Sequence, residues 1–349
     1  MERLMGKAKR GSLTADMARE FVSEIFEISS GEKLLFYSVE KWLADWLETK
    51  AASKTKTTMS SYRVAVAGFL AHLGARRGIN LELLTSHDVT TYRDALVRTK
   101  RSPQTANGYV KILRMPFDVA RKKGLIASNP AEGFDPLTSD KVERSAFTAE
   151  QVGSIVAAAE SAGLCEWVGA IYFGFYTGQR LSDIANLRWE NIELAASFPH
   201  LRLTQRKTRR TVVVPLAPTL SAWLLAQPAS DDPRTFLFPS LAGRGTGGDG
   251  GLSTRFSAIM GKAGFAEDLA RGAEGGRKLA ARSFHSLRHT FTSIMANEGV
   301  AEEIRQKLTG HASAEVHRSY THHELGTLRK AVDVLPALGA VRPSKKRAK

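Results

Sequence analysis

The stretch SFHSLRHTFTSIM, residues 283–295, predicts a helix that packs one face against a core. Its apolar side chains recur at three- and four-residue spacing, which is the period of one helix face. These side chains are Leu287, Phe291, Ile294 and Met295. Beside them stand three basic residues, His285, Arg288 and His289. The stretch therefore predicts a helical domain with cationic groups at the edge of its core.

The three basic residues have three competing explanations: a solvated helix face, a metal site, or a pocket for an anion. A zinc site of the H-E-x-x-H kind needs a glutamate between two histidines spaced four apart. This stretch reads HSLRH, with Arg288 where a metal site tolerates a cation least. We therefore predict no metal ligands here. His289 points further round the helix than His285 and Arg288, so we expect it to be packed or solvated.

The charge balance favours an anionic partner. Among 349 residues, 50 Lys and Arg stand against 35 Asp and Glu, which gives a net charge of +15. Such an excess is typical of proteins that bind nucleic acid, although a merely basic globular protein has the same balance. No stretch of the sequence is apolar and long enough to cross a membrane, and the N-terminus lacks the apolar region of a signal peptide. We expect a cytoplasmic, nucleoid-associated protein.

Cys165 is the single cysteine of the sequence. One cysteine excludes an intrachain disulfide framework and a zinc site built from several cysteines. Its neighbours Leu164, Trp167 and Val168 are apolar, and they predict a packed thiol.

The chain divides by pattern into helical and mixed parts. Residues 14–28 place apolar side chains on one helix face. Four or five helices are predicted after them, followed by a stretch rich in Pro, Asn, Asp and Ser that lacks helical periodicity. The expected parts are an N-terminal extension (1–33), a helical unit (34–127), a linker (128–146), a larger domain (147–335) and a basic tail (336–349).

Basic side chains gather near helix starts and turns of the helical unit. That distribution suits a helical DNA clamp, although solvated lysines have the same pattern. We predict as DNA-binding residues Lys54, Lys56, Arg63, Lys111 and Arg114, together with Arg209 of the larger domain.

The stretch HLRLTQRKTRRTVVVPL, residues 200–216, predicts a β-hairpin with β-branched strands around a basic turn. Lys207 lies in that turn, where a solvated lysine is the plainer alternative. The glycine-rich stretch 243–251 lacks the strand–helix context of a phosphate-binding loop, so it is a weak candidate for one.

The stretch TGQRLSDIANLRW, residues 177–189, predicts a helix that starts near Gly178. Arg180, Asp183, Ile184 and Leu187 share one face of it. An arginine beside a buried stripe is costly unless it is paired or binds an anion. Asp183 can orient Arg180 from three residues on. A purely structural Arg–Asp pair stays open as the alternative.

Histidines and tyrosines are distributed unevenly. Six of the nine histidines lie in the stretch from His285 to His323, whereas Tyr320 is the only tyrosine after Tyr176. A core tyrosine is the first expectation for such a residue. Tyr320, however, stands among polar neighbours in VHRSYTHH rather than in an apolar stripe.

Together these side chains suit chemistry on a phosphodiester. Two guanidiniums can hold both non-bridging oxygens and stabilise a pentacoordinate transition state, and two histidines can add donors. A tyrosine hydroxyl can attack phosphorus in line while a lysine protonates the leaving oxygen. The candidates are Arg180, Lys207, His285, Arg288, His311 and Tyr320. Fixed cations replace a two-metal clamp, and phosphodiester exchange is nearly energy-neutral, so we expect no metal and no cofactor.

Five stretches resemble, in order and spacing, the catalytic motifs of the tyrosine recombinases, the phage integrase family. They are TGQRLSDIANLRW, QRKTRRTVVVPL, HSLRHTF, LTGHAS and RSYTHH. The resemblance implies that Arg180 and Arg288 are paired catalytic arginines and that Tyr320 is the nucleophile. The other implied roles are the hairpin lysine for Lys207, the catalytic histidines for His285 and His311, and the acidic supporting residue for Asp183.

The resemblance also implies the architecture and the partners. The expected fold is mainly α with a small antiparallel β-sheet: a helical, SAM-like core-binding domain at 34–127 and an α+β catalytic domain at 147–335. The expected partner is double-stranded DNA, bound by a tetramer on paired sites. Residues 325–335 are expected to form a helix that docks on a neighbouring protomer, or else caps its own. Residues 242–282 exceed the family minimum and are expected to form a surface insertion.

Other functional classes remain open at this point. A DNA-binding regulator could use the same clamp without catalysis, but every catalytic position holds a competent residue type. A type IB topoisomerase shares the chemistry, so DNA relaxation is a further alternative. A basic RNA-binding protein accounts for the charge but not for the isolated tyrosine. Site-specific DNA recombination through a 3′-phosphotyrosine is the function that the motifs favour.

Overall fold

The computed structural model describes residues 14–31, 36–138, 145–228, 230–248, 250–265 and 281–310. The chain separates into two compact units, and the division falls between Lys141 and Val142. That division lies inside the stretch expected to be the linker. Each unit has a hydrophobic core of its own, as expected for chains of this length.

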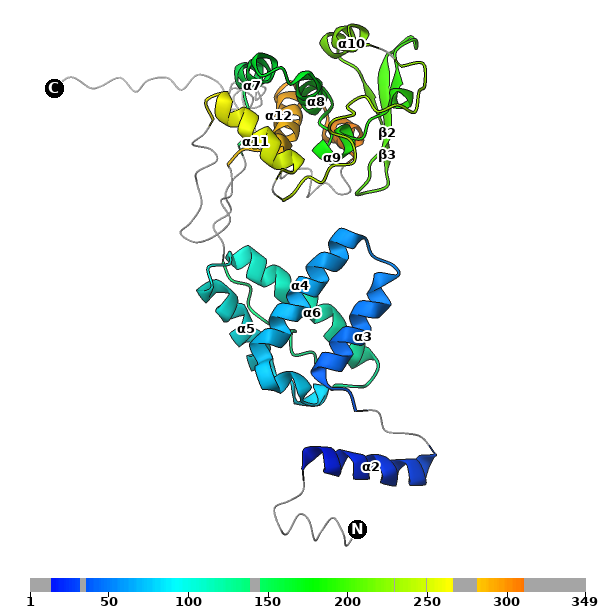
Figure 1. Cartoon of the computed structure of the whole chain (residues 1–349), viewed down its shortest axis with the longest axis vertical. Helices are drawn as coiled ribbons and strands as arrows, with labels where there is room; N and C mark the ends of the chain where they lie inside the picture. The colour runs from blue at the N-terminus through cyan, green and yellow to red at the C-terminus, as the bar shows by residue number, and fades with distance from the viewer. Residues whose placement is uncertain are drawn as a thin grey trace, which may run out of the picture. The chain divides into compact units, whose positions relative to one another are not determined.

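In the described part of the first unit, the helices α3 to α6 pack on one another (Figure 1). Its α-helices are α2 (Ala15–Ser30), α3 (Val39–Ala51), α4 (Lys56–Leu73), α5 (Ser86–Arg98) and α6 (Pro103–Lys122), with short 3₁₀ helices at Gly74–Gly78 and Leu81–Leu83. The starts follow from local sequence: Thr85 caps α5 and Ser102 caps α6, in each case by accepting a hydrogen bond from a backbone N–H of the first turn. The expected helical content of this part is confirmed.

The core of the first unit is formed by α3, α4, α5 and α6. Phe69, Leu113 and Phe117 are fully buried in it. The Trp42 indole N–H donates to the Pro116 carbonyl over 3.1 Å, which satisfies the polar atom of a buried aromatic ring. Ala131 is also fully buried in this cluster, so the beginning of the expected linker packs on the helical unit.

Helix α2 confirms the expected N-terminal helix. Thr14 caps its start, and Gly31 ends it in the left-handed conformation with φ of 74°. The apolar face that the sequence predicted remains accessible: Ile25 is 46% exposed and Ile28 is 86% exposed.

The second unit combines helices with one small sheet. Its elements are α7 (Ala149–Ser161), α8 (Cys165–Thr177), α9 (Leu181–Ile184), a 3₁₀ turn (Trp189–Asn191), β1 (Ile192–Glu193), β2 (His200–Thr204), β3 (Thr211–Pro215), α10 (Pro218–Leu225), α11 (Leu252–Lys262), α12 (Phe284–Asn297) and α13 (Glu302–Thr309). The sheet is antiparallel in the order β1-β2-β3. The predicted fold class, mainly α with a small antiparallel sheet, is confirmed.

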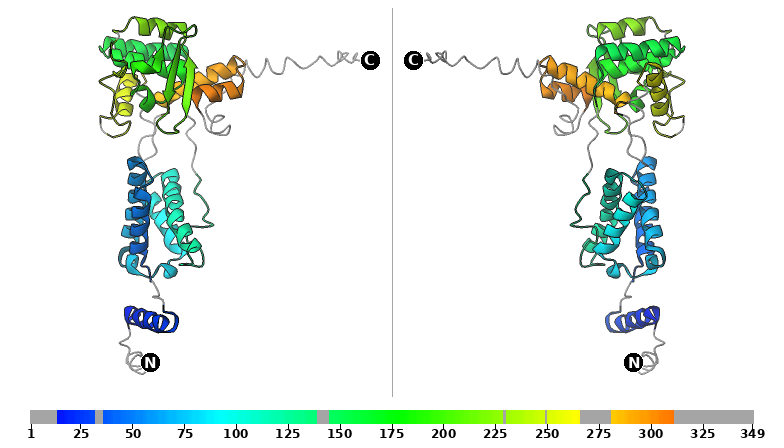
Figure 2. Two further views of the ribbon diagram at one scale, coloured as in Figure 1. Left: turned by 90° about the vertical axis from the view of Figure 1, so that its right-hand side faces the viewer. Right: turned by 90° about the vertical axis from the view of Figure 1, so that its left-hand side faces the viewer.

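The predicted hairpin is present as β2 and β3, which run side by side in Figure 2. Leu201 pairs with Val214 and Leu203 with Val212, and all four side chains are buried. The alternate residues face outward, as expected for a sheet with one covered face. The hairpin thus anchors its basic turn through four apolar side chains.

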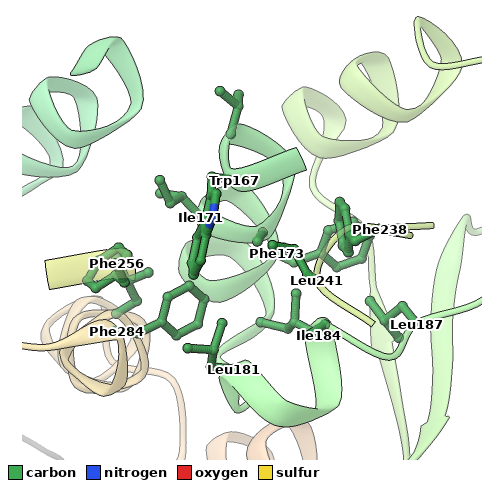
Figure 3. Packing of buried hydrophobic residues seen from close by; sticks show 14 of the residues in the cluster. Trp167, Ile171, Phe173, Leu181, Ile184, Leu187, Phe238, Leu241, Phe256 and Phe284 are labelled. Carbon is green, nitrogen blue, oxygen red and sulfur yellow. The ribbon is translucent and has the colours of Figure 1, made fainter. Parts of the chain in front are cut away.

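Helix α8 lies at the centre of the second unit, where it contacts both α7 and α12. Figure 3 shows the core around it, with Trp167, Ile171 and Phe173 of α8 among the side chains. Leu181 and Phe284 point into the same core. These two residues directly neighbour Arg180 and His285, so core packing fixes the backbone that carries both predicted site residues.

Several local predictions are wrong. No helix starts at Gly178: this glycine ends α8 with φ of 63°, Arg180 is extended, and α9 has only four residues. The left-handed turn interrupts the helical register that placed Arg180 and Leu187 on one face. The Cys165 thiol is exposed rather than packed, because it lies at the first turn of α8.

Two further expectations about packing need correction. The stretch 242–282 is not simply a surface insertion, since α11 lies within it and buries Leu252, Phe256 and Met260 in the core. On α12, Leu287 and Phe291 are buried as expected, but Ile294 is 42% exposed and contributes little to holding the helix. None of the described helices is long and apolar enough to span a membrane.

The close packing of α8 leads to a stability prediction. A Cβ at Gly169 would overlap the Trp223 ring and would lie 2.7 Å from Phe238 Cε1. We expect Gly169→Ala to lower the free energy of unfolding by about 1–3 kcal/mol, the usual cost of overpacking. The matched control is Gly153→Ala in α7, where nothing lies within 4 Å of the added Cβ; it should raise stability by about 0.5–1 kcal/mol. Urea denaturation of the full chain measures both, and equal shifts would contradict the packing argument.

Candidate active site

The segment between α8 and α9 presents the first predicted arginine. Gly178 turns the chain in the left-handed conformation, and a Cβ there would meet the Phe291 ring at 2.6 Å. Gln179 follows and is buried, with its side-chain amide donating to the Leu308 carbonyl over 2.8 Å. Arg180 is then extended at the start of α9. The turn therefore holds Arg180 at the edge of the core, at the position where α9 begins.

Asp183 connects Arg180 to the β-hairpin. Its Oδ1 accepts a hydrogen bond from the Arg206 backbone N–H over 3.0 Å. Its Oδ2 lies 3.9 Å from Arg180 Nη1, an ion pair in which the Asp183 side chain is almost completely buried. The sequence predicted a supporting carboxylate beside Arg180, and the structure places Asp183 there.

The hairpin turn carries Lys207 and Arg209, and both side chains are exposed. Arg209 has φ of 58°, so the turn includes a left-handed residue that is not glycine. Hydrogen bonds join the Gln205 N–H to the Arg210 carbonyl and the Arg209 N–H to the Gln205 carbonyl, each over 2.8 Å. The backbone of the turn is thus fixed by hydrogen bonds, whereas the Lys207 side chain is exposed to solvent.

Helix α12 brings His285 to the same place as Arg180. The two residues line one cleft of about 190 Å³, together with Ser182, Ser283 and Thr246 among others. His285 is half-buried and its ring lies 5.7 Å from that of His289. His289 is buried, which agrees with the expectation that it is packed rather than part of the site.

Arg288 differs from the expected pocket wall, because its side chain is only 1% exposed. Nη1 donates to the Gly178 carbonyl over 2.8 Å, and Nη2 donates to the Thr309 carbonyl over 2.6 Å. The guanidinium therefore joins the turn after α8 to the end of α13. Arg288 holds the backbone that carries Arg180 and the backbone that leads to His311.

Two glutamines that sequence reasoning missed complete this arrangement. Gln205 is fully buried and Gln179 is 1% exposed, and the two side-chain amides are hydrogen-bonded over 2.8 Å. A sequence signal existed for Gln205, since Leu201, Leu203 and Gln205 occupy successive inward positions of the predicted strand. For Gln179, the sequence shows only a position beside Arg180.

Three predicted features lie outside the described residues. They are His311, Tyr320 and the segment 325–335. Description ends at Gly310, which closes α13 in the left-handed conformation with φ of 69°. The roles of His311 and Tyr320 therefore stay predictions. Within the described ranges, no group of three or more His, Cys, Asp and Glu side chains could hold a metal ion.

The DNA-binding residues predicted in the first unit are all exposed. Lys54 precedes α4, Lys56 and Arg63 lie on it, and Lys111 lies on α6. Arg114 is less suited to the role, because its guanidinium is 3.4 Å from Glu132 and 3.9 Å from Asp118. Surface ion pairs of this kind are weak, so a DNA phosphate could replace the carboxylate partners of Arg114. For the other four cations, the described structure gives no carboxylate partner that DNA would have to replace.

The second unit matches the model of a known protein family. The model of the phage integrase family matches residues 145–325, about half of the chain and nearly all of the second unit. The chain belongs to the phage integrase family. The resemblance to tyrosine recombinases that the motifs indicated is thereby confirmed.

Two relatives show how much of the chain is shared. IntQ of Escherichia coli (strain K12), described as a defective protein, is 24% identical over 228 residues, which cover 62% of this chain and 56% of IntQ. A tyrosine recombinase of Thermosipho africanus (strain TCF52B) is 23% identical over 273 residues, which cover 77% of this chain and 89% of the relative. The chain thus spans little more than half of the first relative and most of the second.

A solved structure supports the fold over both units. The lambda integrase tetramer bound to a Holliday junction matches with a TM-score of 0.61 at 18% identity, covering 89% of this chain and 88% of the integrase chain. At this identity, the similarity to the solved structure shows the fold alone, which is the integrase fold.

Proposed function

We propose that the chain is a site-specific DNA recombinase that cuts and rejoins double-stranded DNA through a covalent 3′-phosphotyrosine. The observation that carries the proposal is the joint placement of Arg180 and His285 around one cleft, next to the buried Asp183 and Arg288. In a member of the phage integrase family, this is a cationic pocket of the kind that a scissile phosphate needs.

In the first step the Tyr320 hydroxyl oxygen attacks the scissile phosphorus, and the bond from phosphorus to the 5′-oxygen breaks. The tyrosine hydroxyl gives its proton to solvent, and the protonated Lys207 gives a proton to the leaving 5′-oxygen. Arg180 and Arg288 stabilise the charge on the non-bridging oxygens, with His285 and His311 as further donors. A 5′-hydroxyl of the partner strand then attacks the phosphotyrosine, which restores the tyrosine and a phosphodiester.

The units divide the work on DNA. The core-binding domain (34–127) holds the duplex with Lys54, Lys56, Arg63, Lys111 and Arg114, and the catalytic domain (147–335) adds Arg209. By analogy with the lambda integrase tetramer on a Holliday junction, four copies act together on paired sites. Residues 325–335 dock on a neighbouring copy, and the protein works on chromosomal DNA in the nucleoid.

The test uses a nicked duplex that carries a site selected by this chain from a random-sequence pool. Cleavage close to the nick releases a short fragment, so the covalent complex cannot be rejoined. We expect a protein–DNA adduct that resists denaturant, with the DNA attached through its 3′-phosphate. A chain that binds the selected site without forming the adduct would be a regulator rather than a recombinase.

Lys207 is testable by the chemistry of the leaving group. Lys207→Ala should slow cleavage by about 10²–10⁴-fold, the usual contribution of a general acid. A substrate with a 5′-thio leaving group needs no protonation and should restore the rate to near that of the unaltered chain. The neighbouring variant Arg206→Ala is the control, and it should show no selective rescue. Absence of rescue in Lys207→Ala would move the role of general acid to another basic residue.

A further inference from the structure

Gln205 lies at the centre of a buried hydrogen-bond network that joins three parts of the second unit. It follows β2 and is fully buried. Its Oε1 accepts from Arg180 Nη1 over 3.0 Å and from the Thr208 hydroxyl over 2.7 Å. Its Nε2 donates to Gln179 Oε1 and to the Thr309 carbonyl, each over 2.8 Å. One side chain thus contacts the turn before α9, the hairpin turn and the end of α13.

The chemistry of the partners fixes which way the amide points. A guanidinium only donates hydrogen bonds, so the atom that faces Arg180 must be the amide oxygen. A backbone carbonyl only accepts, so the atom that faces Thr309 must be the amide nitrogen. Both ends of Gln205 are used, and a flipped amide would break contacts at both. Among the twenty side chains, only an amide of this length supplies both functions at these positions.

Gln205 provides a directional hold on Arg180. The Asp183 carboxylate, 3.9 Å from Arg180 Nη1, lies beyond hydrogen-bond distance. In the described part of the chain, the closer acceptor for that nitrogen is Gln205 Oε1. Because a hydrogen bond to a charged donor is short and directional, it fixes the plane of the guanidinium as well as its distance.

The network also leaves no space at the end of α13. A Cβ added to Gly310 would lie 2.7 Å from both the Oε1 and the Nε2 of Gln205. The same Thr309 carbonyl accepts from Arg288 Nη2 over 2.6 Å. Gln205 and Arg288 therefore converge on the residue two positions before His311. The backbone that leads to His311 is held by the same side chain that holds Arg180.

We propose that Gln205 is a positioning residue of the recombination reaction, which sets the guanidinium of Arg180 against the scissile phosphate. The proposal rests on the proposed function of the cleft. Gln205 touches no substrate; it acts through Arg180. A misplacement of about 1 Å at a reacting centre costs about 10²-fold in rate, so the loss of this hold should be large in cleavage and small in DNA affinity.

The test compares two substrates in Gln205→Met, which keeps the side-chain volume and removes all four hydrogen bonds. One substrate carries the normal scissile phosphate, and the other a methylphosphonate, in which a methyl group replaces one charged oxygen. On the phosphate, single-turnover cleavage at saturating DNA should fall by about 10–100-fold. Cleavage of the neutral phosphonate depends less on charge stabilisation by Arg180. On that substrate, Gln205→Met should therefore cleave at most about threefold more slowly than the unaltered chain. A merely structural defect would reduce both rates equally and would overturn the proposal.

Two further variants make the result specific. Gln205→Glu keeps an oxygen that accepts from Arg180 and loses the N–H donor. Its ratio of phosphonate to phosphate cleavage should therefore stay near that of the unaltered chain. A shifted ratio would contradict the proposal, even if Gln205→Met does not fold. Gln227→Met is the control, since the side-chain amide of Gln227 donates to the Trp223 carbonyl of α10. If the unaltered chain forms no adduct at all, the proposed function fails. If the unaltered chain cleaves, the role of Gln205 is overturned by an unchanged ratio in Gln205→Met or by a shifted ratio in Gln205→Glu.

Discussion

Replacing Tyr320 by phenylalanine is expected to abolish the covalent protein–DNA adduct while leaving DNA binding intact. Phenylalanine keeps the ring and removes only the hydroxyl, which is the proposed nucleophile. Without this hydroxyl, cleavage should fall by at least about 10⁴-fold, the range seen when a nucleophile is removed. Gel electrophoresis under denaturing conditions measures the adduct, and fluorescence anisotropy at fixed salt measures binding.

The control for this variant is Tyr176→Phe, because Tyr176 is half-buried in α8 and packs against Phe175 and Tyr172. Its hydroxyl has no proposed role, so the adduct should form at the normal rate. An adduct that persists in Tyr320→Phe would assign the nucleophile to another residue. Loss of DNA binding in the same variant would show instead that Tyr320 supports the fold.

The sequence predicted those parts of the molecule that follow from local pattern. The hairpin could be predicted because Leu201 and Leu203 alternate with polar residues on one strand, and the other strand is a run of β-branched residues, 211–214. The core helix at 284–297 was readable from the spacing of Leu287 and Phe291. Where these elements carry a polar residue next to a core position, as at His285, the site could be predicted with them.

The failures arise where a single residue overrides the pattern. Gly178 ends α8 in the left-handed conformation, and this divides what a helical wheel presents as one continuous face. In the stretch 242–282, glycines hid the helical spacing of Leu252, Phe256 and Met260, which are core residues of α11. In both places, long-range packing decides the structure, and local propensity does not contain that information.

The buried polar contacts could not be predicted, because they join residues far apart in sequence. Gln205 and Thr309 are 104 positions apart, and Arg288 reaches the Gly178 carbonyl across 110 positions. Polar residues are costly to bury without partners, so their burial implies partners, yet the sequence does not say which ones. The sequence thus predicted Arg180 and Arg288 as candidate cations and missed the groups that hold both in place.

Replacing Arg288 by alanine is expected to reduce both cleavage and stability. The variant removes a buried guanidinium that donates to the Gly178 and Thr309 carbonyls. It leaves a cavity and takes this donor from the Gly178 carbonyl, whereas the Thr309 carbonyl keeps its hydrogen bond from Gln205 Nε2. Such losses cost about 3–5 kcal/mol, or about 6–20 °C in the melting temperature of a unit this size. Cleavage below the melting temperature should fall by about 10³-fold or more, because a cation of the proposed phosphate pocket is gone.

Arg305→Ala separates these two effects. Arg305 is also a buried arginine, and its Nε donates to the Val300 carbonyl over 2.9 Å, but it has no proposed role in the cleft. Its removal should lower the melting temperature while cleavage in the folded protein stays within about threefold of normal, since no catalytic contact is lost. If Arg288→Ala and Arg305→Ala behaved alike in cleavage as well as in stability, Arg288 would be a structural clamp alone. A melting temperature unchanged in Arg288→Ala would contradict the clamp, because the two carbonyls that it joins would then be held by other contacts.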